Sequence, residues 1–474
     1  MLTLAHFLIT LTEYIASGKE PKLSTVVMDS REVKKGSLFV AVAGERVDGH
    51  DFVESAFANG AVAALVERPF PNTTTIDLRT NNQQSTINSQ QLTSQSPICL
   101  VVDDAVTALQ QAAAAWCAKF DTTIIGITGS VGKTSTKELA HSVMSTRYNT
   151  FKSEGNRNSV LGLPLTIFGL RPFHQYAILE MAMYTQGEIA RLANLFPPKI
   201  GVVTLIGAVH MERAGSMEAI VAAKQELVEA LPADGVAILN EDDERVMSMA
   251  EHTEARIFTY GLDQTADLWA DNIQSRGLDG MSFALHHQNE AINLQVPLLG
   301  RHSVHTSLRA AAVGLTTGLS WEEIAFGLRQ NQAQLRLVTV SGPKESIIID
   351  DTYNANPEST MAALNLLDDM QGRRIAVLGD MLELGHVEEA SHRLIGRRAA
   401  DVAHIIITAG KRARWIAEEA QAIGMRKDRI FMADDAKTAV PILTDLIQPK
   451  DVILVKGSLG MRMDQIINAI GKYD

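Results

Sequence analysis

Cysteine is scarce in this sequence, and long apolar stretches are missing from it. The two cysteines, Cys99 and Cys117, have neither the number nor the spacing of a disulfide framework or a metal site, which favours a reducing cytoplasm. No apolar run reaches the roughly 18 residues that a membrane-spanning helix requires. We therefore expect a cytoplasmic protein without a membrane span.

Positive charge is also in short supply, since 43 lysines and arginines face 55 aspartates and glutamates, for a net charge of −12. This balance argues against nucleic acid or an anionic membrane as a general partner. The 46% of hydrophobic and 21% of charged residues are typical of globular proteins. At roughly 150 residues per domain, the 474 residues predict about three domains.

Two segments are unusual in composition. The first 17 residues lack the early basic residues and the cleavage site of a signal peptide, and their apolar residues follow helical spacing. We expect an amphipathic helix there that docks on the protein. Residues 71–97 are rich in Asn, Gln, Ser and Thr, which predicts a polar surface insertion.

Strands alternate with helices along most of the chain, which predicts an α/β protein with mostly parallel sheets. In the middle region the expected strands are 124–127, 176–179, 200–205 and 236–239, before a polar strand-like stretch at 255–296 and helices at 305–328. The later expected strands are 347–350, 374–378, 405–408 and 451–455, with helices at 357–369 and 387–400. This last part has the pattern of a doubly wound, Rossmann-like domain. The predicted domains are 1–104, 105–335 and 336–474.

A glycine-rich loop at residues 128–136 follows a short apolar run and leads into a predicted helix. Strand, glycine loop and helix in this order surround nucleotide phosphates with backbone N–H groups. Gly129 and Gly132 allow the backbone to come close, Lys133 would hold the β- and γ-phosphate oxygens, and the Thr134 hydroxyl would ligate Mg²⁺. A glycine turn that merely caps the helix is the alternative. The strand context, with Lys133 and Thr134, favours ATP or GTP.

Four further candidates lie near the ends of predicted strands or on a following helix. Glu180 closes a strand, where a carboxylate faces the ligand crevice and can bind Mg²⁺; a solvated strand end is the alternative. His210 also follows a strand and is equally compatible with a structural role. Lys224, on a helix, would by itself be interpreted as part of a solvated face. Asn240 could recognise an adenine edge, although an acidic turn that caps the next helix is the simpler interpretation.

Two loops in the last third of the chain are rich in functional groups. Residues 350–357, Asp-Asp-Thr-Tyr-Asn-Ala-Asn-Pro, follow a predicted strand. A capped helix start explains Asn356 and Pro357 but not the acids and the aromatic side chain before them. Residues 456–462 combine glycines with Lys456 and Arg462 and could bind a carboxylate or phosphate. Ordinary surface-loop composition explains this second loop about as well.

In this arrangement the chain resembles the Mur ligases from about residue 24 to residue 470, with 71–97 as an extra segment. The shared landmarks are Asp29-Ser30-Arg31, Leu38-Phe39-Val40-Ala41, Gly44-Glu45, Asp48-Gly49-His50-Asp51-Phe52, residues 128–136, Gly155-Asn156-Arg157-Asn158, Gly162, Pro164, Leu179-Glu180-Met181, Asn240, Asp242-Asp243, Gly300-Arg301-His302, residues 350–357 and residues 379–385. The strings at 350–357 and 379–385 are the most specific and favour the branch that adds D-alanyl-D-alanine. Ser303 and Thr306 stand where relatives usually have asparagine.

The resemblance implies three domains: a small α/β domain that binds a UDP-linked substrate, a central ATPase domain, and a C-terminal Rossmann-like domain that brings the amine. It implies ATP and Mg²⁺ as cofactors. The residues implied for ATP are Gly129, Ser130, Val131, Gly132, Lys133, Thr134, Ser135, Asn240, His302, Arg336 and Asp351. The implied catalytic residues are Lys133, Glu180, His210 and Lys224, and the implied metal ligands are Thr134, Glu180, His210 and a carbamylated Lys224. Ser30 and Arg31 are implied for the uridine nucleotide, and Asn354, Asn356 and Lys456 for the amine substrate.

The activity that the resemblance implies is ATP-dependent, ADP-forming amide synthesis. An acyl phosphate made from UDP-N-acetylmuramoyl-tripeptide would be attacked by D-alanyl-D-alanine, in peptidoglycan precursor synthesis for the cell wall, cell shape and cell division. A monomer is expected. The alternatives are a related ligase that adds the third amino acid of the peptide or glutamate to folate, and a phosphate-loop switch of another class.

Overall fold

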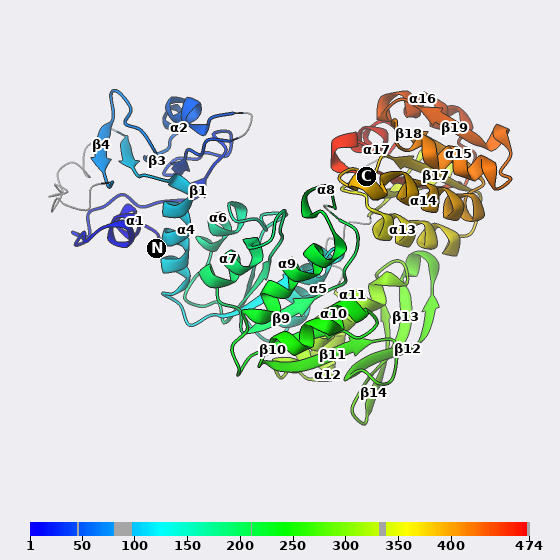
Figure 1. The fold of residues 1–474 in the computed structure, drawn as a ribbon, viewed down its shortest axis with the longest axis horizontal. Helices are drawn as coiled ribbons and strands as arrows, with labels where there is room; N and C mark the ends of the chain where they lie inside the picture. The colour runs from blue at the N-terminus through cyan, green and yellow to red at the C-terminus, as the bar shows by residue number, and fades with distance from the viewer. Residues whose placement is uncertain (45–46, 80–96, 210, 331–337, 472–474) are drawn as a thin grey trace. The chain divides into compact units, whose positions relative to one another are not determined.

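The computed structural model describes residues 1–44, 47–79, 97–209, 211–330 and 338–471. Figure 1 shows helices and strands that alternate through most of the chain and form three separate sheets. The chain divides into two compact units, one of residues 1–124, 153–181 and 190–197, and one of residues 125–152, 182–189 and 198–474. The predicted α/β class is confirmed.

The first sheet has five parallel strands in the order β1-β2-β3-β5-β4. The strands are β1 (Val26–Val27), β2 (Leu38–Val40), β3 (Ala63–Val66), β5 (Ile98–Val101) and β4 (Thr74–Asp77), and the helices are α1 (Leu4–Leu11), α2 (Val53–Ala58) and α4 (Ala105–Cys117). One core is filled by Phe39, Val53 and Val101. The N-terminal helix is confirmed, because Phe7 of α1 is fully buried and stacks on Phe168, with ring centroids 5.3 Å apart.

The expected polar insertion at 71–97 is wrong in part. Thr74–Asp77 form the edge strand β4, which pairs in parallel with β5. Only Ile76 of this strand is buried, between exposed or half-buried neighbours, as an edge strand with one covered face requires. The strand could not be predicted from the sequence, because one apolar side chain does not change the polar composition of the segment. Residues 80–96 lie outside the described part of the chain.

The second sheet has nine strands in the order β14-β13-β12-β11-β10-β9-β6-β8-β7. They are β6 (Thr123–Thr128), β7 (Thr150–Lys152), β8 (Tyr176–Glu180), β9 (Ile200–Val203), β10 (Val236–Asn240), β11 (Arg256–Gly261), β12 (Leu268–Ser275), β13 (Met281–His287) and β14 (Glu290–Val296). The strands from β6 through β9, β10 and β11 to β12 pair in parallel, whereas β12, β13 and β14 pair antiparallel. The strands expected in the middle region are all present.

The helices of this region are α5 (Lys133–Met144), α6 (Gly162–Ile167), α7 (Glu188–Leu195), α8 (Met211–Ala214), α9 (Met217–Glu229), α10 (Glu244–Met247), α11 (His302–Thr316) and α12 (Trp321–Arg329). Helices α9 and α10 cover one side of β9 and β10 through Ile220, Val228 and Val246. Helices α5, α11 and α12 pack on one another. The parallel strands therefore end in loops that are held by helices, which is where ligands bind in such sheets.

The third sheet has the order β15-β16-β20-β17-β18-β19, antiparallel between β15 and β16 and parallel elsewhere. The elements are β15 (Val338–Ser341), β16 (Ile347–Asp351), β17 (Arg374–Gly379), β18 (Ile405–Ala409), β19 (Ile430–Ala433), β20 (Val452–Lys456), α13 (Pro357–Asp369), α14 (Glu388–Val402), α15 (Arg414–Ala422), α16 (Ala436–Leu446) and α17 (Asp464–Ile470). Helices α13, α14 and α15 form a core on one face, and α16 and α17 on the other. The doubly wound prediction is confirmed.

Helix α13 begins and ends as predicted, for a local reason. The Asn356 side chain accepts a hydrogen bond from the Ser359 N–H (2.8 Å), the Asn356 N–H donates to the Ser359 hydroxyl (3.2 Å), and Pro357 occupies the first turn. The domain limits at 104/105 and 335/336 stay predictions. No helix within the described ranges is both long and apolar enough to cross a membrane.

Candidate nucleotide site and strand-end clusters

The phosphate loop connects β6 to α5. Gly129 (φ +138°) and Gly132 (φ +87°) both adopt backbone conformations that side chains disfavour. Gly132 is the N-cap of α5, and Lys133, Thr134 and Ser135 form the first turn of that helix. The first N–H groups of a helix attract anions, so the loop has the local structure of a phosphate site.

The loop is fastened to the chain segment that follows β9. The Thr204 hydroxyl donates to the Val131 carbonyl (2.7 Å). The Ser130 hydroxyl donates to the Gly207 carbonyl (3.0 Å) and accepts from the Gly207 N–H (2.9 Å), and the Ser130 N–H donates to the Leu205 carbonyl (2.8 Å). These bonds fix the loop in position without using a ligand.

Two lysines lie at this loop. Lys133 Nζ donates to the Gly129 carbonyl (2.7 Å) and the Ser130 carbonyl (3.2 Å), so its cation lies over the loop. Lys224 comes from α9 and is 2% exposed, so its interpretation as a solvated helix face is wrong. Burial, and then the Lys133 cation, hold the pKa of the Lys224 amine well below its usual value. Among the described residues no acidic side chain forms an ion pair with it.

Glu180 ends β8 and is 1% exposed, so the solvated alternative is wrong here too. The Asn158 amide donates to the Glu180 Oε1 (2.7 Å), and the Glu180 N–H donates to the Ser153 hydroxyl (3.1 Å). The bond from Asn158 orients the buried carboxylate, and the bond to Ser153 holds the backbone. Glu180 and Asn158 belong to one compact unit and the phosphate loop to the other. His210 lies outside the described residues.

Asn240, at the end of β10, is buried and engaged by the backbone. Its side-chain amide donates to the Thr204 carbonyl (3.1 Å), and its Oδ1 accepts from the Asp242 N–H (3.3 Å). The acidic turn is also present, because Asp243 caps α10 and accepts from the Ile206 N–H (2.8 Å). Asn240 therefore supports Thr204, and its contact with adenine stays a prediction.

His302 begins α11 in a surrounding of cations. Its side chain reaches solvent on one side. Desolvation on the other sides, and then the charges of Arg309 and Lys456, lower its pKa to about 4, so the imidazole is neutral near pH 7. The Thr306 hydroxyl donates to the His302 carbonyl (3.4 Å) and accepts from Arg309 Nη2 (2.9 Å). Arg336 lies outside the described residues.

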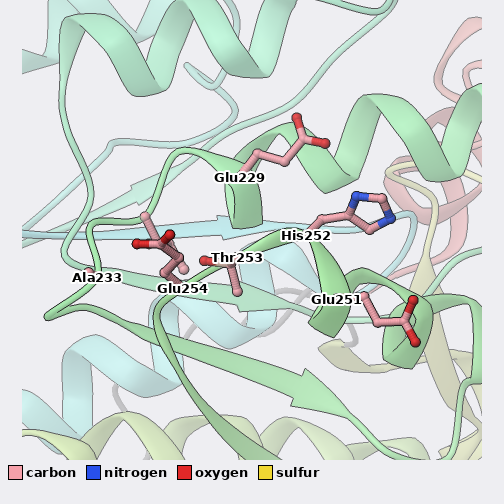
Figure 2. Close-up of a pocket in the computed structure, with 7 residues that line it drawn as sticks. Glu229, Ala233, Glu251, His252, Thr253 and Glu254 are labelled. Carbon is pink, nitrogen blue, oxygen red and sulfur yellow. The ribbon is translucent and has the colours of Figure 1, made fainter.

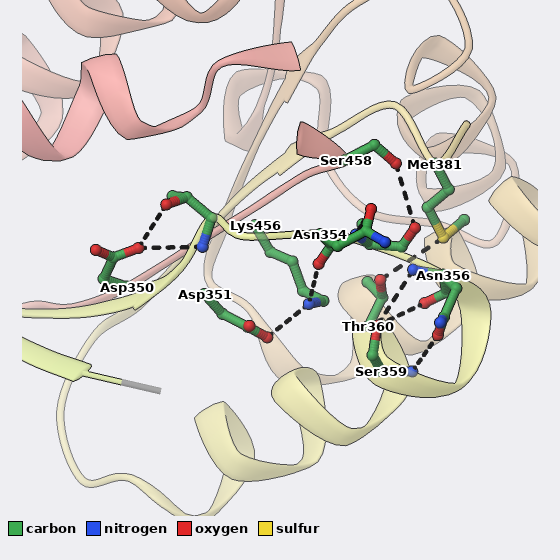
Figure 3. A network of polar contacts seen from close by, with 11 residues as sticks. Asp350, Asp351, Asn354, Asn356, Ser359, Thr360, Met381, Lys456 and Ser458 are labelled. Carbon is green, nitrogen blue, oxygen red and sulfur yellow. Dashed lines mark hydrogen bonds and ion pairs between the residues drawn. The ribbon is translucent and has the colours of Figure 1, made fainter. Parts of the chain in front are cut away.

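A second cluster lies at the strand ends of the third sheet (Figure 3). Asp351 and Lys456 face each other because β16 and β20 run parallel with these two residues in register. Lys456 is 1% exposed, and its Nζ donates to Asp351 Oδ2 (2.6 Å) and to the Asn354 carbonyl (2.8 Å). The Asn354 Oδ1 accepts from the Ala355 N–H (2.9 Å). Lys456 thus holds the loop after β16, and its contact with an amine substrate stays a prediction.

The predicted uridine residues belong to the first sheet's unit. Arg31 is largely exposed, and its guanidinium donates to both carboxylate oxygens of Asp29 (2.9 and 2.6 Å). These bonds hold the pKa of Asp29 at about 2. The Ser30 carbonyl accepts from the Asn59 amide (3.1 Å). The Asp29 carboxylate therefore holds the Arg31 cation in an orientation that solvent can reach.

One surface hollow, of about 400 Å³, is lined by Glu229, Leu231, Ala233, Glu251, His252, Thr253 and Glu254 (Figure 2). These residues precede β10 and β11, so the hollow lies at the amino ends of those strands. Ligands of parallel sheets bind at the carboxyl ends, and none of the predicted site residues lines the hollow. We assign it no function.

Sequence reasoning gave no role to Asn158, Thr204 or Arg309. Asn158 was present only as part of a shared landmark, and Thr204 only as part of a strand. Arg309 is the single charged residue in an otherwise small or apolar run, 306–313, and lies three residues after Thr306 and seven after His302. Those intervals place Arg309, Thr306 and His302 on one helix face, and this pattern could have indicated a role for Arg309.

Comparisons with known proteins agree with this architecture. Three family models match: Mur ligase family, catalytic domain, at residues 22–116; Mur ligase middle domain at 127–314; and Mur ligase, glutamate ligase domain, at 335–459. The UDP-N-acetylmuramoyl-tripeptide–D-alanyl-D-alanine ligase of Bacillus subtilis (strain 168) is 35% identical over 446 residues, which cover 93% of this chain and 92% of that protein.

Solved structures are similar as well. The crystal structure of MurF from Acinetobacter baumannii matches with a TM-score of 0.83 and 30% identity and covers 98% of each chain. The MurF ligase from Thermotoga maritima in complex with ADP matches with a TM-score of 0.77 and 26% identity, over 96% of this chain and 98% of that chain. The three-domain architecture is therefore that of a known group of structures.

Gly129→Ala is expected to abolish nucleotide binding. A Cβ on Gly129 would lie 1.8 Å from the Thr204 hydroxyl oxygen, in a backbone conformation that also strains alanine. Gly424→Ala is the matched control, because Gly424 has a similar positive φ of +109° but nothing within 4 Å of its Cβ position. Calorimetric titration with ADP should show binding to the control and not to Gly129→Ala. Equal ADP affinity in both variants would contradict this account of the loop.

Proposed function

This chain belongs to the Mur ligase family, and we propose that it is the ADP-forming ligase that joins D-alanyl-D-alanine to UDP-N-acetylmuramoyl-tripeptide in peptidoglycan precursor synthesis. One observation carries this proposal: the likeness to a ligase of that name covers 93% of the chain and so spans all three sheets. Ligases that add the third amino acid or folate glutamate are less well supported. A phosphate-loop switch would not need the two other domains.

ATP fits the phosphate loop because the loop is already formed. Gly129 allows the loop to pack against Thr204, where a Cβ would clash, Lys133 holds a cation over the loop, and the loop leads into the N-terminus of α5. The similar Thermotoga maritima structure was determined in complex with ADP. We assign the polyphosphate to residues 129–135. His302, Arg336, Asn240 and Asp351 are assigned to the adenosine side.

Apart from His210, the donor set proposed for Mg²⁺ consists of oxygens, which this ion prefers. Thr134 would contribute its hydroxyl and Glu180 its buried carboxylate, which Asn158 orients. His210 and a carbamate on Lys224 complete the proposed ligands. When bound, Mg²⁺ would neutralise charge that spreads over the phosphoryl oxygens.

Lys224 has the chemistry that carbamylation needs. Burial and the neighbouring Lys133 cation favour the neutral amine, and only a neutral amine adds to CO₂. The addition forms an N–C bond and releases one proton, and it replaces a potential cation with an anion beside Lys133. The carbamate anion would thereby form an attractive pair with the Lys133 cation.

The joining reaction requires an activated carboxylate. The substrate carboxylate would attack the γ-phosphorus, forming an acyl phosphate and ADP, while Lys133 stabilises the negative charge. The amine of D-alanyl-D-alanine would then attack the carbonyl carbon and expel phosphate.

Arg31, oriented by Asp29, is assigned with Ser30 to the uridine nucleotide. Asn354 and Asn356, on the loop that Lys456 holds, are assigned to the dipeptide.

We further propose a monomer that works in the cytoplasm, where UDP-linked precursors and ATP are both present. Cys99 and Cys117 are free and buried, as suits a reducing compartment. Burial raises the pKa of both thiols, which keeps them protonated and unreactive.

Formation of ADP should require both the UDP-linked tripeptide and D-alanyl-D-alanine. The acyl phosphate is useful only when an amine intercepts it, so omission of either substrate should reduce ADP release to background. Coupled detection of ADP and mass spectrometry of the product would measure this. D-alanine and D-glutamate serve as control amines. ATP turnover that ignores both substrates, or a product with either control amine instead of the dipeptide, would overturn the proposal.

Lys224→Ala should lose nearly all activity, by about a hundredfold or more, since a ligand for the phosphoryl-neutralising ion is removed. Short carboxylic acids such as acetate should restore part of that activity by filling the space with a carboxylate. Lys133→Ala is the matched control, because it removes a cation and acetate should not rescue it. Full activity of Lys224→Ala without acetate would reject the carbamate.

A further inference from the structure

Arg309 lies behind the phosphate loop with its guanidinium almost completely enclosed. It comes from the middle of α11 and is 3% exposed. Its Nε donates to the Thr136 hydroxyl (2.7 Å) and its Nη2 to the Thr306 hydroxyl (2.9 Å). Its Nη1 is buried and has no hydrogen-bond partner in the structure. Such a donor is costly to leave unpaired inside a protein.

The positive charge of Arg309 is also uncompensated. No acidic side chain within the described ranges forms an ion pair with it, and the side chains that it contacts, Thr136, Thr306 and Tyr260, carry neutral hydroxyls. The Tyr260 ring lies beneath the guanidinium, with its centroid 5.8 Å from Cζ. The Asp242 carboxylate is paired with His305 (2.7 Å). A buried cation without a counter-ion is strongly unfavourable, so its retention points to an anion that arrives from outside.

The direction in which this anion must arrive follows from the loop. Arg309 Nη2 lies 3.0 Å from the position that a Cβ on Gly132 would take. Gly132 caps α5, and Thr136, which Arg309 contacts, is in the same helix. The guanidinium therefore touches the inner side of the helix start whose outer side accepts phosphate. Its charge adds to that of the helix N-terminus.

We propose that Arg309 is a positioning residue for the nucleotide, whose buried cation draws the polyphosphate onto the loop from behind and is compensated only when the polyphosphate is bound. The proposal rests on the nucleotide-binding part of the proposed function and adds a residue to it. Contact with the adenine base would be a different role, and the experiment separates the two.

The test compares two replacements that both lose the planar fork but differ in charge. Arg309→Lys keeps the cation, and Arg309→Gln removes it while retaining a donor for Thr136. Arg256→Gln is the control for the loss of one positive charge, because Arg256 is exposed at the first residue of β11, at the opposite end of the strand from the loops. Calorimetric titration with ATP, ADP, AMP, adenosine and inorganic triphosphate would be done for each protein.

Electrostatic positioning predicts a loss that grows with the charge of the ligand. ATP should bind Arg309→Gln about tenfold or more weakly, AMP only slightly more weakly, and adenosine as it binds the wild type. Arg309→Lys should stay within about threefold of the wild type for every ligand. Arg256→Gln should behave as the wild type. Without nucleotide, Arg309→Gln should unfold at the wild-type temperature or above, because an unpaired buried charge has been removed.

Four results would overturn the proposal: unchanged ATP affinity in Arg309→Gln, an equal loss for all five ligands, a loss confined to the ligands that contain adenine, or a nucleotide-free variant that does not fold. An equal loss or a failure to fold would mean that the guanidinium is a structural member of the core. A loss confined to ligands with adenine, and absent with inorganic triphosphate, would indicate base contact instead. If the wild type itself did not bind ATP, the proposed function would be wrong. That result differs from every result that would overturn only the role of Arg309.

Discussion

The hydrogen bond from the Thr204 hydroxyl to the Val131 carbonyl (2.7 Å) is the contact on which the nucleotide site depends. A phosphate loop directs its N–H groups to one side, so the bonds that fix its shape must come from the other side. Thr204, just after β9, supplies one of them, beside those from Leu205 and Gly207, and its own carbonyl is held by Asn240 and by the Tyr260 hydroxyl (3.1 and 2.8 Å). Loop, neighbouring strands and helix start are thus locked before any ligand binds, which removes the cost of ordering them during the reaction.

Charge is distributed unequally between the two strand-end clusters. In the third sheet the buried Lys456 cation is matched by Asp351 (2.6 Å). At the phosphate loop Lys224 and Arg309 are both buried, and no described acid forms an ion pair with either. A buried cation without an acidic partner is suited to an anionic ligand, and a nucleoside triphosphate provides several charges at once. The acidic net charge of the chain, −12, conceals this local excess of positive charge.

The sequence was sufficient where a local pattern determines the structure. The Asn356-Pro357 cap predicted α13 to the residue, and the apolar runs predicted the parallel strands. The sequence was insufficient where the role of a residue depends on whether it is buried. Lys224 and Glu180 could not be separated from solvated residues by spacing, because their burial depends on neighbouring elements. The pairing of Asp351 with Lys456, 105 residues apart, depends on the register of β16 and β20. Strand β4 was not predicted because Ile76 is its only buried residue and its neighbours in the sequence are polar.

The central claim is that a triphosphate held at residues 129–135 activates a carboxylate for attack by an amine. The most direct test labels both oxygens of the terminal carboxylate of the UDP-linked tripeptide with ¹⁸O and follows one complete turnover with D-alanyl-D-alanine and ATP. An acyl phosphate predicts that one labelled oxygen per product appears in the inorganic phosphate and the other remains in the new amide. Unlabelled phosphate, formed alongside the amide product, would contradict the account.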